Sequence, residues 1–306
     1  INDLLEDPRC PDHNRRDALH ECGHIHDAMG QYDEAFDAFS RANAMLDDKV
    51  LIPIDEFREV WSREAIEGIP EGSETSDRPV FVVCMPRSGT TLTEQILAAH
   101  PKIATVGESN GLTLLLHDKR PPDFDAALVS RAASVYLEKT TIPLAGKVSR
   151  VVDKMPENYY YLAAISKAMP NASIIHSTRD ARDICLSCFF QNFGMRLPWT
   201  RRIETCARQF VLYRQIMNHW AEVLDISVLE NNYERMTSDP RPSVEAMLAH
   251  VGMPFDEACM AHHKQKSNVN TASVDQVRNP IYTSSQQRWK RYEKHLGPML
   301  EILEGY

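Results

Sequence analysis

The chain has 306 residues, of which 43% are hydrophobic and 25% charged, as in a folded globular protein. Its 43 Asp and Glu against 34 Lys and Arg give a net charge of −9, which argues against non-specific binding of nucleic acid. No apolar run approaches the ~18 residues of a membrane-spanning helix, so we expect a soluble protein that binds no membrane. Seven cysteines without an even spacing indicate reduced thiols and a cytoplasmic location.

Residues 1–70 are predicted to be helical, because apolar side chains recur there at helical spacing. Gly30 separates two such runs, which predicts a helix–turn–helix. The segment resembles a tetratricopeptide repeat, whose consensus spacing is matched by Leu19, Gly23, Gly30, Tyr32, Ala35, Phe39 and Ala42. One repeat cannot bury its own apolar face, so we expect it to end a longer array that extends upstream of Ile1 and can recruit a protein partner.

The same segment contains a zinc-protease pattern, H-E-x-x-H, at His20–His24. No third ligand follows at a recognised spacing, and Gly23 stands where the repeat consensus has a small residue. We therefore predict a repeat helix with no bound metal.

Residues 71–78 form a polar linker, and the pattern then changes to that of an α/β domain over residues 79–306. Short apolar runs near 79–84, 150–153, 173–177 and 227–229 predict buried strands. Helical segments are predicted near 90–100, 123–140, 157–168, 181–192, 202–224 and 241–251. Strands that alternate with helices predict a parallel sheet with helices on both faces.

The most informative segment is Cys84–Leu92, in which a strand, a turn of small residues and a helix start follow one another. The first N–H groups of such a helix and the positive end of its dipole form an anion site. Arg87, Ser88, Gly89, Thr90 and Thr91 would supply a charge, hydroxyls and a flexible backbone. The sequence therefore predicts a phosphate-binding loop, although the nucleotide-triphosphate pattern G-x-x-x-x-G-K-[ST] is absent.

The run P-R-S-G-T-T-L resembles the 5′-phosphosulfate loop of sulfotransferases, which use 3′-phosphoadenosine 5′-phosphosulfate (PAPS) and release adenosine 3′,5′-bisphosphate (PAP). Further motifs are similar to those of tyrosylprotein sulfotransferases, and the repeat in front resembles that of bacterial tetratricopeptide-repeat sulfotransferases. The resemblance covers most of residues 79–296. It implies an α/β fold with a P-loop-type parallel sheet between helices.

Three of these motifs imply further contacts with PAPS. Arg179 and Ser187 resemble the pair that holds the 3′-phosphate, and an arginine fork with a nearby hydroxyl suits a phosphate. Tyr233, in N-Y-E-R-M, resembles the tyrosine near the nucleoside. Ser273 and Arg288 occupy the positions of a serine and a lysine that contact the phosphosulfate.

The resemblance also implies the catalytic groups. Glu108, in T-V-G-E, resembles the general base of tyrosylprotein sulfotransferases, and Lys154, in D-K-M-P, resembles the lysine that stabilises the transferring group. Arg87 would add positive charge at the loop. Small-molecule sulfotransferases use a histidine base instead, so His100 and His117 remain alternatives to Glu108.

We therefore interpret the sequence as that of a PAPS-dependent sulfotransferase that acts without a metal on a hydroxyl acceptor. A peptide tyrosine, a saccharide and a small alcohol all remain open as acceptors. One rival interpretation is a kinase-like phosphotransferase. The other is a repeat scaffold that only binds nucleotide.

Overall fold

The computed structural model describes residues 5, 9–47, 53–140, 142–144, 146, 148–264 and 285–306. The chain divides into two compact units. Unit 1 combines Ile1–Ile52, Asp180–Tyr213 and Ser284–Tyr306, and unit 2 combines Pro53–Arg179 and Arg214–Thr283. Each unit therefore contains segments that are distant in the sequence.

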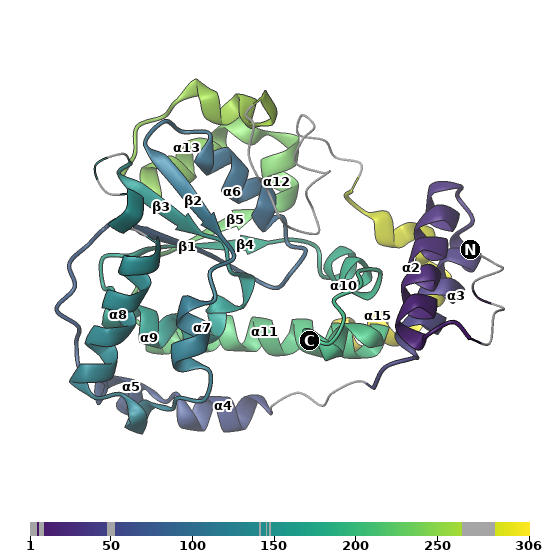
Figure 1. The fold of residues 1–306 in the computed structure, drawn as a ribbon, viewed down its shortest axis with the longest axis horizontal. Helices are drawn as coiled ribbons and strands as arrows, with labels where there is room; N and C mark the ends of the chain where they lie inside the picture. Colours follow the sequence, from purple (N-terminus) through teal and green to yellow (C-terminus); the bar gives the residue numbers. More distant parts are fainter. Residues whose placement is uncertain are drawn as a thin grey trace. The chain divides into compact units, whose positions relative to one another are not determined.

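Unit 2 is built on a five-stranded sheet in which every neighbouring pair is parallel. The strand order is β2-β3-β1-β4-β5 (Figure 1). The strands are β1 (Pro79–Val83), β2 (Ile103–Gly107), β3 (Arg150–Asp153), β4 (Ser173–Thr178) and β5 (Val228–Asn232). The predicted parallel α/β sheet is thus confirmed. All five residues of β1 are buried, as a continuous apolar run in the centre of a parallel sheet requires.

Helices cover both faces of this sheet (Figure 1). One face carries α6 (Thr90–Ala98), α12 (Tyr233–Ser238) and α13 (Pro240–His250), and its core includes Val82, Ile96, Ile175 and Met247. The other face carries α8 (Ala126–Thr140) and α9 (Leu162–Ala168). There Phe81 of β1 packs on Tyr136 of α8, with 5.1 Å between the ring centres.

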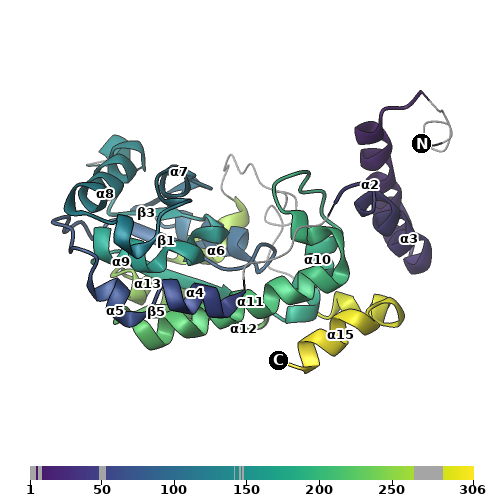
Figure 2. The ribbon, with the colours of Figure 1, turned by 90° about the horizontal axis from the view of Figure 1, so that it is seen from below.

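Short elements complete unit 2. They are α4 (Ile54–Val60), α5 (Arg63–Glu67), α7 (Gly111–Leu116), η1 (Pro121–Asp123), η2 (Ile142–Leu144), η3 (Pro156–Tyr161) and η5 (Glu257–Lys264). Helix α4 lies beside the end of α11 (Ile203–Val223), as both views show (Figures 1 and 2). Phe57 of α4 contacts Trp220 of α11 at 5.3 Å between ring centres, and the indole N–H of Trp220 donates to the Tyr159 carbonyl. This aromatic cluster anchors the helical segment 54–67 to the sheet unit.

Unit 1 is helical. It contains α2 (Asp12–Ala28), α3 (Tyr32–Asn43), α10 (Ala181–Phe189), η4 (Pro198–Arg201), the start of α11, η6 (Arg288–His295) and α15 (Gly297–Glu304). Gly30 turns the chain between α2 and α3 with a φ of 74°, where the sequence predicts a break. A Cβ atom at Gly23 would lie 2.7 Å from the Phe39 ring, so only glycine lets the two helices pack this closely. The assignment of this pair to a tetratricopeptide repeat stays a prediction.

Among the described residues, no helix combines the length and the apolar character that crossing a bilayer requires.

Candidate active site

The carboxyl ends of the five strands collect the residues that the sequence singles out. Strands β2 and β3 lie on one side of β1, and β4 and β5 lie on the other. In open parallel sheets, ligands bind outside the carboxyl ends of the strands where the order reverses in this way. Gly89 lies in the loop after β1, and Glu108, Lys154, Arg179 and Tyr233 directly follow β2, β3, β4 and β5. The fold therefore brings predicted residues from five strands to one edge.

The loop after β1 has a backbone suited to an anion. Arg87 and Gly89 both have positive φ, at 71° and 87°. This conformation is unfavourable for an arginine, and alternating backbone of this kind forms concavities lined by N–H groups. The Ser88 hydroxyl donates to the Met85 carbonyl at 2.7 Å, so in this structure it stabilises the loop from within.

Helix α6 starts directly after this loop. Gly89 occupies the position before its first turn and, being a glycine, has no side chain that could cap that turn. The first N–H groups of a helix have no partner inside the helix, so they can donate to a bound anion. Thr90 and Thr91, both buried, occupy the first two positions of the helix.

Tyr233 and Arg179 pack around the same loop. A Cβ atom at Gly89 would lie 2.4 Å from Cδ2 of Tyr233, so the tyrosine ring leaves room only for glycine there. The Arg179 guanidinium carbon lies 4.6 Å from the centre of the Tyr233 ring, as in a cation–π contact. Nη1 of Arg179 also donates to the Arg87 carbonyl at 3.1 Å. Arg87, Gly89, Arg179 and Tyr233 are therefore neighbours.

Glu108 and Lys154 form an ion pair at the ends of β2 and β3. Nζ of Lys154 lies 2.7 Å from Oε1 of Glu108, and the exposed fractions of the two side chains are 1% and 29%. The backbone N–H of Lys154 donates to the Gly107 carbonyl at 2.9 Å, which fixes the two strand ends side by side. The buried ammonium group thus has a carboxylate partner that solvent can still reach.

Two buried carboxylates beside this pair were not identified from the sequence. Burial raises the pKa of Glu94, which α6 carries, and raises the pKa of Asp153, the last residue of β3, to about 7. Lys154 acts in the opposite direction on both groups. The sequence offers only an acidic residue within a predicted helix and another at the end of an apolar run. This signal is weak, because most acidic residues of a folded protein are exposed to solvent.

Three predicted residues are not in the described part of unit 2. Ser187, on α10, and Arg288, on η6, belong to unit 1. There Arg288 forms an ion pair with Asp27 at 2.7 Å and lies over the Phe190 ring. Ser273 lies outside the described residues. The proposed contacts of these three residues with PAPS stay predictions.

The two rival histidines differ in position from Glu108. His100 precedes β2, whereas Glu108 follows it, so the whole strand separates them, a length of roughly 17 Å at ~3.3 Å per residue. Nδ1 of His100 accepts from the Lys102 N–H at 3.0 Å. His117 is exposed and contacts Asp118 at 2.7 Å. Of these three candidates for the base, only Glu108 directly follows a strand at the carboxyl edge.

The H-E-x-x-H segment lies in unit 1, on α2. The ring centres of His20 and His24 lie 5.8 Å and 5.0 Å from that of Phe39, and burial lowers the pKa of His20 to about 4. Within the described part of the chain, no group of three or more His, Cys, Asp or Glu could hold a metal ion.

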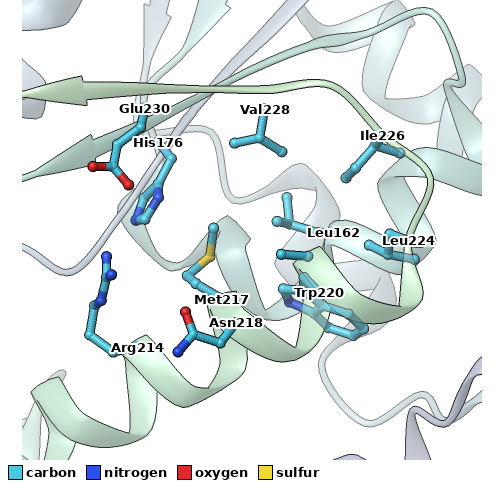
Figure 3. A pocket seen from close by; sticks show the side chains of 11 residues that line it. Leu162, His176, Arg214, Met217, Asn218, Trp220, Leu224, Ile226, Val228 and Glu230 are labelled. Atoms are coloured by element: carbon cyan, nitrogen blue, oxygen red, sulfur yellow. The ribbon is translucent and has the colours of Figure 1, made fainter.

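A separate cavity of about 300 Å³ lies on the α9 and α11 side of the sheet. Figure 3 shows His176, Glu230 and Arg214 at one end of it and Trp220, Leu224 and Ile226 at the other. Burial lowers the pKa of His176 to about 3, and the Arg214 charge acts in the same direction. The imidazole is therefore neutral in the folded chain at neutral pH.

His176 should make the fold sensitive to acid. Because its folded pKa lies below the ordinary 6.5, only the unfolded chain binds a proton there between pH 6.5 and about 3. The contribution of His176 to the free energy of unfolding is therefore fully present above pH 6.5 and declines as the pH falls below that value. At ~1.4 kcal/mol per pH unit, the loss is ~2 kcal/mol at pH 5. His176→Gln should narrow the difference in urea unfolding free energy between pH 7.5 and 5 by this amount. If the unfolding free energy of the unaltered chain and that of His176→Gln fell equally between pH 7.5 and 5, the predicted role of His176 would be wrong.

Comparison with known proteins supports one family. The model of the sulfotransferase family matches residues 79–257, more than half of the chain. An uncharacterized protein of Aquifex aeolicus is 32% identical over 333 residues, which cover 100% of this chain and 44% of that protein. Protein-tyrosine sulfotransferase A of Caenorhabditis elegans is 22% identical over 241 residues, or 69% of this chain and 60% of the worm protein. The chain thus spans less than two thirds of either relative.

A solved structure supports the same fold. The sulfotransferase domain of the Synechococcus PCC 7002 olefin synthase matches with a TM-score of 0.53 and 17% identity, over 78% of this chain and 97% of that one. The match extends the fold resemblance beyond the segment that the family model covers. The parallel sheet, the loop before α6 and the matched segment 79–257 together identify the chain as a member of the sulfotransferase family.

Proposed function

We propose that this chain transfers a sulfuryl group from PAPS to a hydroxyl acceptor. The observation that carries the proposal is the Glu108–Lys154 ion pair, which lies at the same sheet edge as the loop before α6. A protein that only binds nucleotide has no need of a carboxylate and an ammonium group in contact at this edge. The family membership supports the reaction class.

The described residues fit the phosphate groups of PAPS. The residue before the first turn of α6 is a glycine, which leaves that turn without a cap from its own side chain, and the loop has the positive φ values of an anion-binding backbone. Arg87 and Arg179 add two positive charges beside this loop, which favours a dianionic ligand although the whole chain is acidic. Arg179 would hold the 3′-phosphate.

In this proposal Glu108 is the general base, and Lys154 and Arg87 stabilise negative charge. PAPS supplies an activated sulfuryl group with a phosphate as its leaving group. Glu108 accepts the proton of the acceptor hydroxyl at its carboxylate group, which Lys154 contacts through Oε1. Lys154 and Arg87 offset the negative charge that grows on the leaving phosphate. Neither role requires a metal ion.

The first acceptor to test is a peptide tyrosine, because curated relatives carry the name protein-tyrosine sulfotransferase. A saccharide and a small alcohol are the alternatives. We further propose that the helical segment 1–70 binds the protein that carries the acceptor, and that residues 71–78 link it to the catalytic segment 79–306. The relatives extend beyond this chain, so the acceptor of the whole protein belongs to the same proposal.

A titration and a transfer assay test the function. By calorimetry, PAP should bind more tightly than ADP, because ADP lacks the 3′-phosphate. Transfer from PAPS to at least one member of a panel of tyrosine peptides, saccharides and alcohols should proceed in EDTA, because the loop lacks the Lys-Ser/Thr pair that holds Mg²⁺ in nucleotide triphosphatases. Mg²⁺-dependent transfer from ATP would favour the kinase interpretation. PAP binding without transfer to any acceptor would favour the scaffold.

A further inference from the structure

Helix α6 is tied to the end of β2 by a chain of side-chain hydrogen bonds. Glu94 of α6 is buried, and its Oε1 accepts a hydrogen bond from the hydroxyl group of Thr105 on β2. The Thr105 oxygen in turn accepts the backbone N–H of Gly107 at 3.1 Å. The helix that begins at the phosphate-binding loop therefore holds the residue before Glu108.

A second buried carboxylate holds the residue after Glu108. Oδ1 of Asp153 accepts the backbone N–H of Ser109 at 3.4 Å. Asp153 is the last residue of β3 and precedes Lys154, the ion-pair partner of Glu108. The backbone on both sides of Glu108 is thus held by hydrogen bonds to neighbouring side chains.

The pairing of β2 with β3 does not by itself fix the direction of the Glu108 side chain. The register between β2 and β3 shifts between Thr105 and Gly107, and Gly107 has a φ of 69°. An irregular strand end of this kind leaves the direction of the next side chain to other contacts. The bonds from Glu94 through Thr105, and from Asp153, supply them.

We propose that Glu94, Thr105 and Asp153 form a positioning brace, which sets the Glu108 carboxylate against Lys154 at the carboxyl edge of the sheet. The inference rests on the proposed function, in which Glu108 is the base. None of the three residues is a catalytic residue in this scheme, because each acts through the backbone beside Glu108.

The burial of the brace supports this interpretation. An apolar residue would fill these interior positions without the desolvation that raises the pKa of Glu94 and Asp153. The charged groups that act on Glu94 are Lys154 and Glu108, and those that act on Asp153 are Glu94 and Lys154. Two carboxyl groups lie next to the ion pair in spite of this unfavourable desolvation. Their presence indicates that they help to set the geometry of the Glu108–Lys154 pair.

Thr105→Val tests the brace with almost no change in side-chain shape. It removes the hydroxyl that joins Glu94 to Gly107, so kcat should fall by about 10–100-fold, the range expected for a misplacement of roughly 1 Å. The KM for PAPS and the affinity for PAP should stay within about threefold, because the phosphate-binding loop is unchanged. Thr105→Ser restores the hydroxyl and should recover most of kcat.

Thr200→Val is the matched control, because Thr200 is a buried threonine of unit 1 whose hydroxyl donates to the Leu197 carbonyl at 2.8 Å. It should leave kcat unchanged. A crystal structure of Thr105→Val without ligand should show the Glu108 carboxylate displaced from Lys154 Nζ, and this readout does not depend on activity. An undisplaced carboxylate, an unchanged kcat, or an equal fall in PAP affinity would overturn the brace. If the unaltered chain transfers no sulfuryl group, the proposed function fails, and the crystal structure still decides whether the brace exists.

Discussion

Glu108→Gln should lower kcat for sulfuryl transfer by about 10²–10⁴-fold, the usual contribution of a general base. The amide keeps the shape of the side chain and can still accept a hydrogen bond from Lys154, but it cannot take the hydroxyl proton. Affinity for PAP should change by less than about threefold, because the base acts on the acceptor and not on the phosphates. Steady-state kinetics with the best acceptor and calorimetry with PAP measure the two effects separately.

Glu257→Gln provides the matched control for this substitution. Glu257 also pairs with a cation, Arg241, at 2.8 Å, but on an exposed surface of unit 2. Its replacement should leave kcat unchanged. Full activity of Glu108→Gln, together with a loss of turnover in folded His100→Gln or His117→Gln, would transfer the role of the base to a histidine.

Strands β1, β3 and β4 could be predicted because their burial leaves a local pattern. β1, Pro79–Val83, is buried throughout and its sequence is a short apolar run, whereas β3, Arg150–Asp153, has two buried valines between charged ends. β2, Ile103–Gly107, has four half-buried residues and contains Ala, Thr and Gly. Its composition is that of an edge strand, and none of the four apolar runs that predict strands includes it.

The candidate site was predictable where one short segment carries the chemistry. The loop before α6 combines its charge, small residues and helix start within a few positions, and Arg179, Lys154 and Glu108 each directly follow a strand. The contact of Arg179 with Tyr233 and the ties from Glu94 and Asp153 join residues that are far apart in the sequence. Such contacts depend on which strands are neighbours, and no local pattern contains that information.

Which segments of the chain form each unit could not be predicted, for the same reason. Unit 1 gathers segments from the start, the middle and the end of the chain. In it, the Asp183 carboxylate accepts the backbone N–H groups of Gln287 and Trp289, about a hundred residues further along. A carboxylate in the first turn of a helix has a local explanation in the helix dipole, so the sequence gives no reason to look for a distant partner.

Arg179→Ala should weaken PAP binding by about 2–4 kcal/mol, or roughly 30–1,000-fold, as expected when a charge-assisted contact to a phosphate is lost. The structure adds a second effect. Because the Arg179 guanidinium donates to the Arg87 carbonyl and packs on Tyr233, its removal also loosens the phosphate-binding loop. AMP, which has the 5′-phosphate alone, should therefore lose some affinity, but less than PAP.

Comparison of the two ligands separates these effects. The difference between the PAP and AMP losses, measured by calorimetry, reports the contact with the 3′-phosphate, and the AMP loss reports the loop. Arg241→Ala is the control, because Arg241 also lies over an aromatic ring, Phe255, at 4.7 Å, but on α13, whose residues are not assigned to the site. It should change neither affinity. Equal losses for PAP and AMP in Arg179→Ala would mean that Arg179 only supports the loop, and the 3′-phosphate would then need another cation.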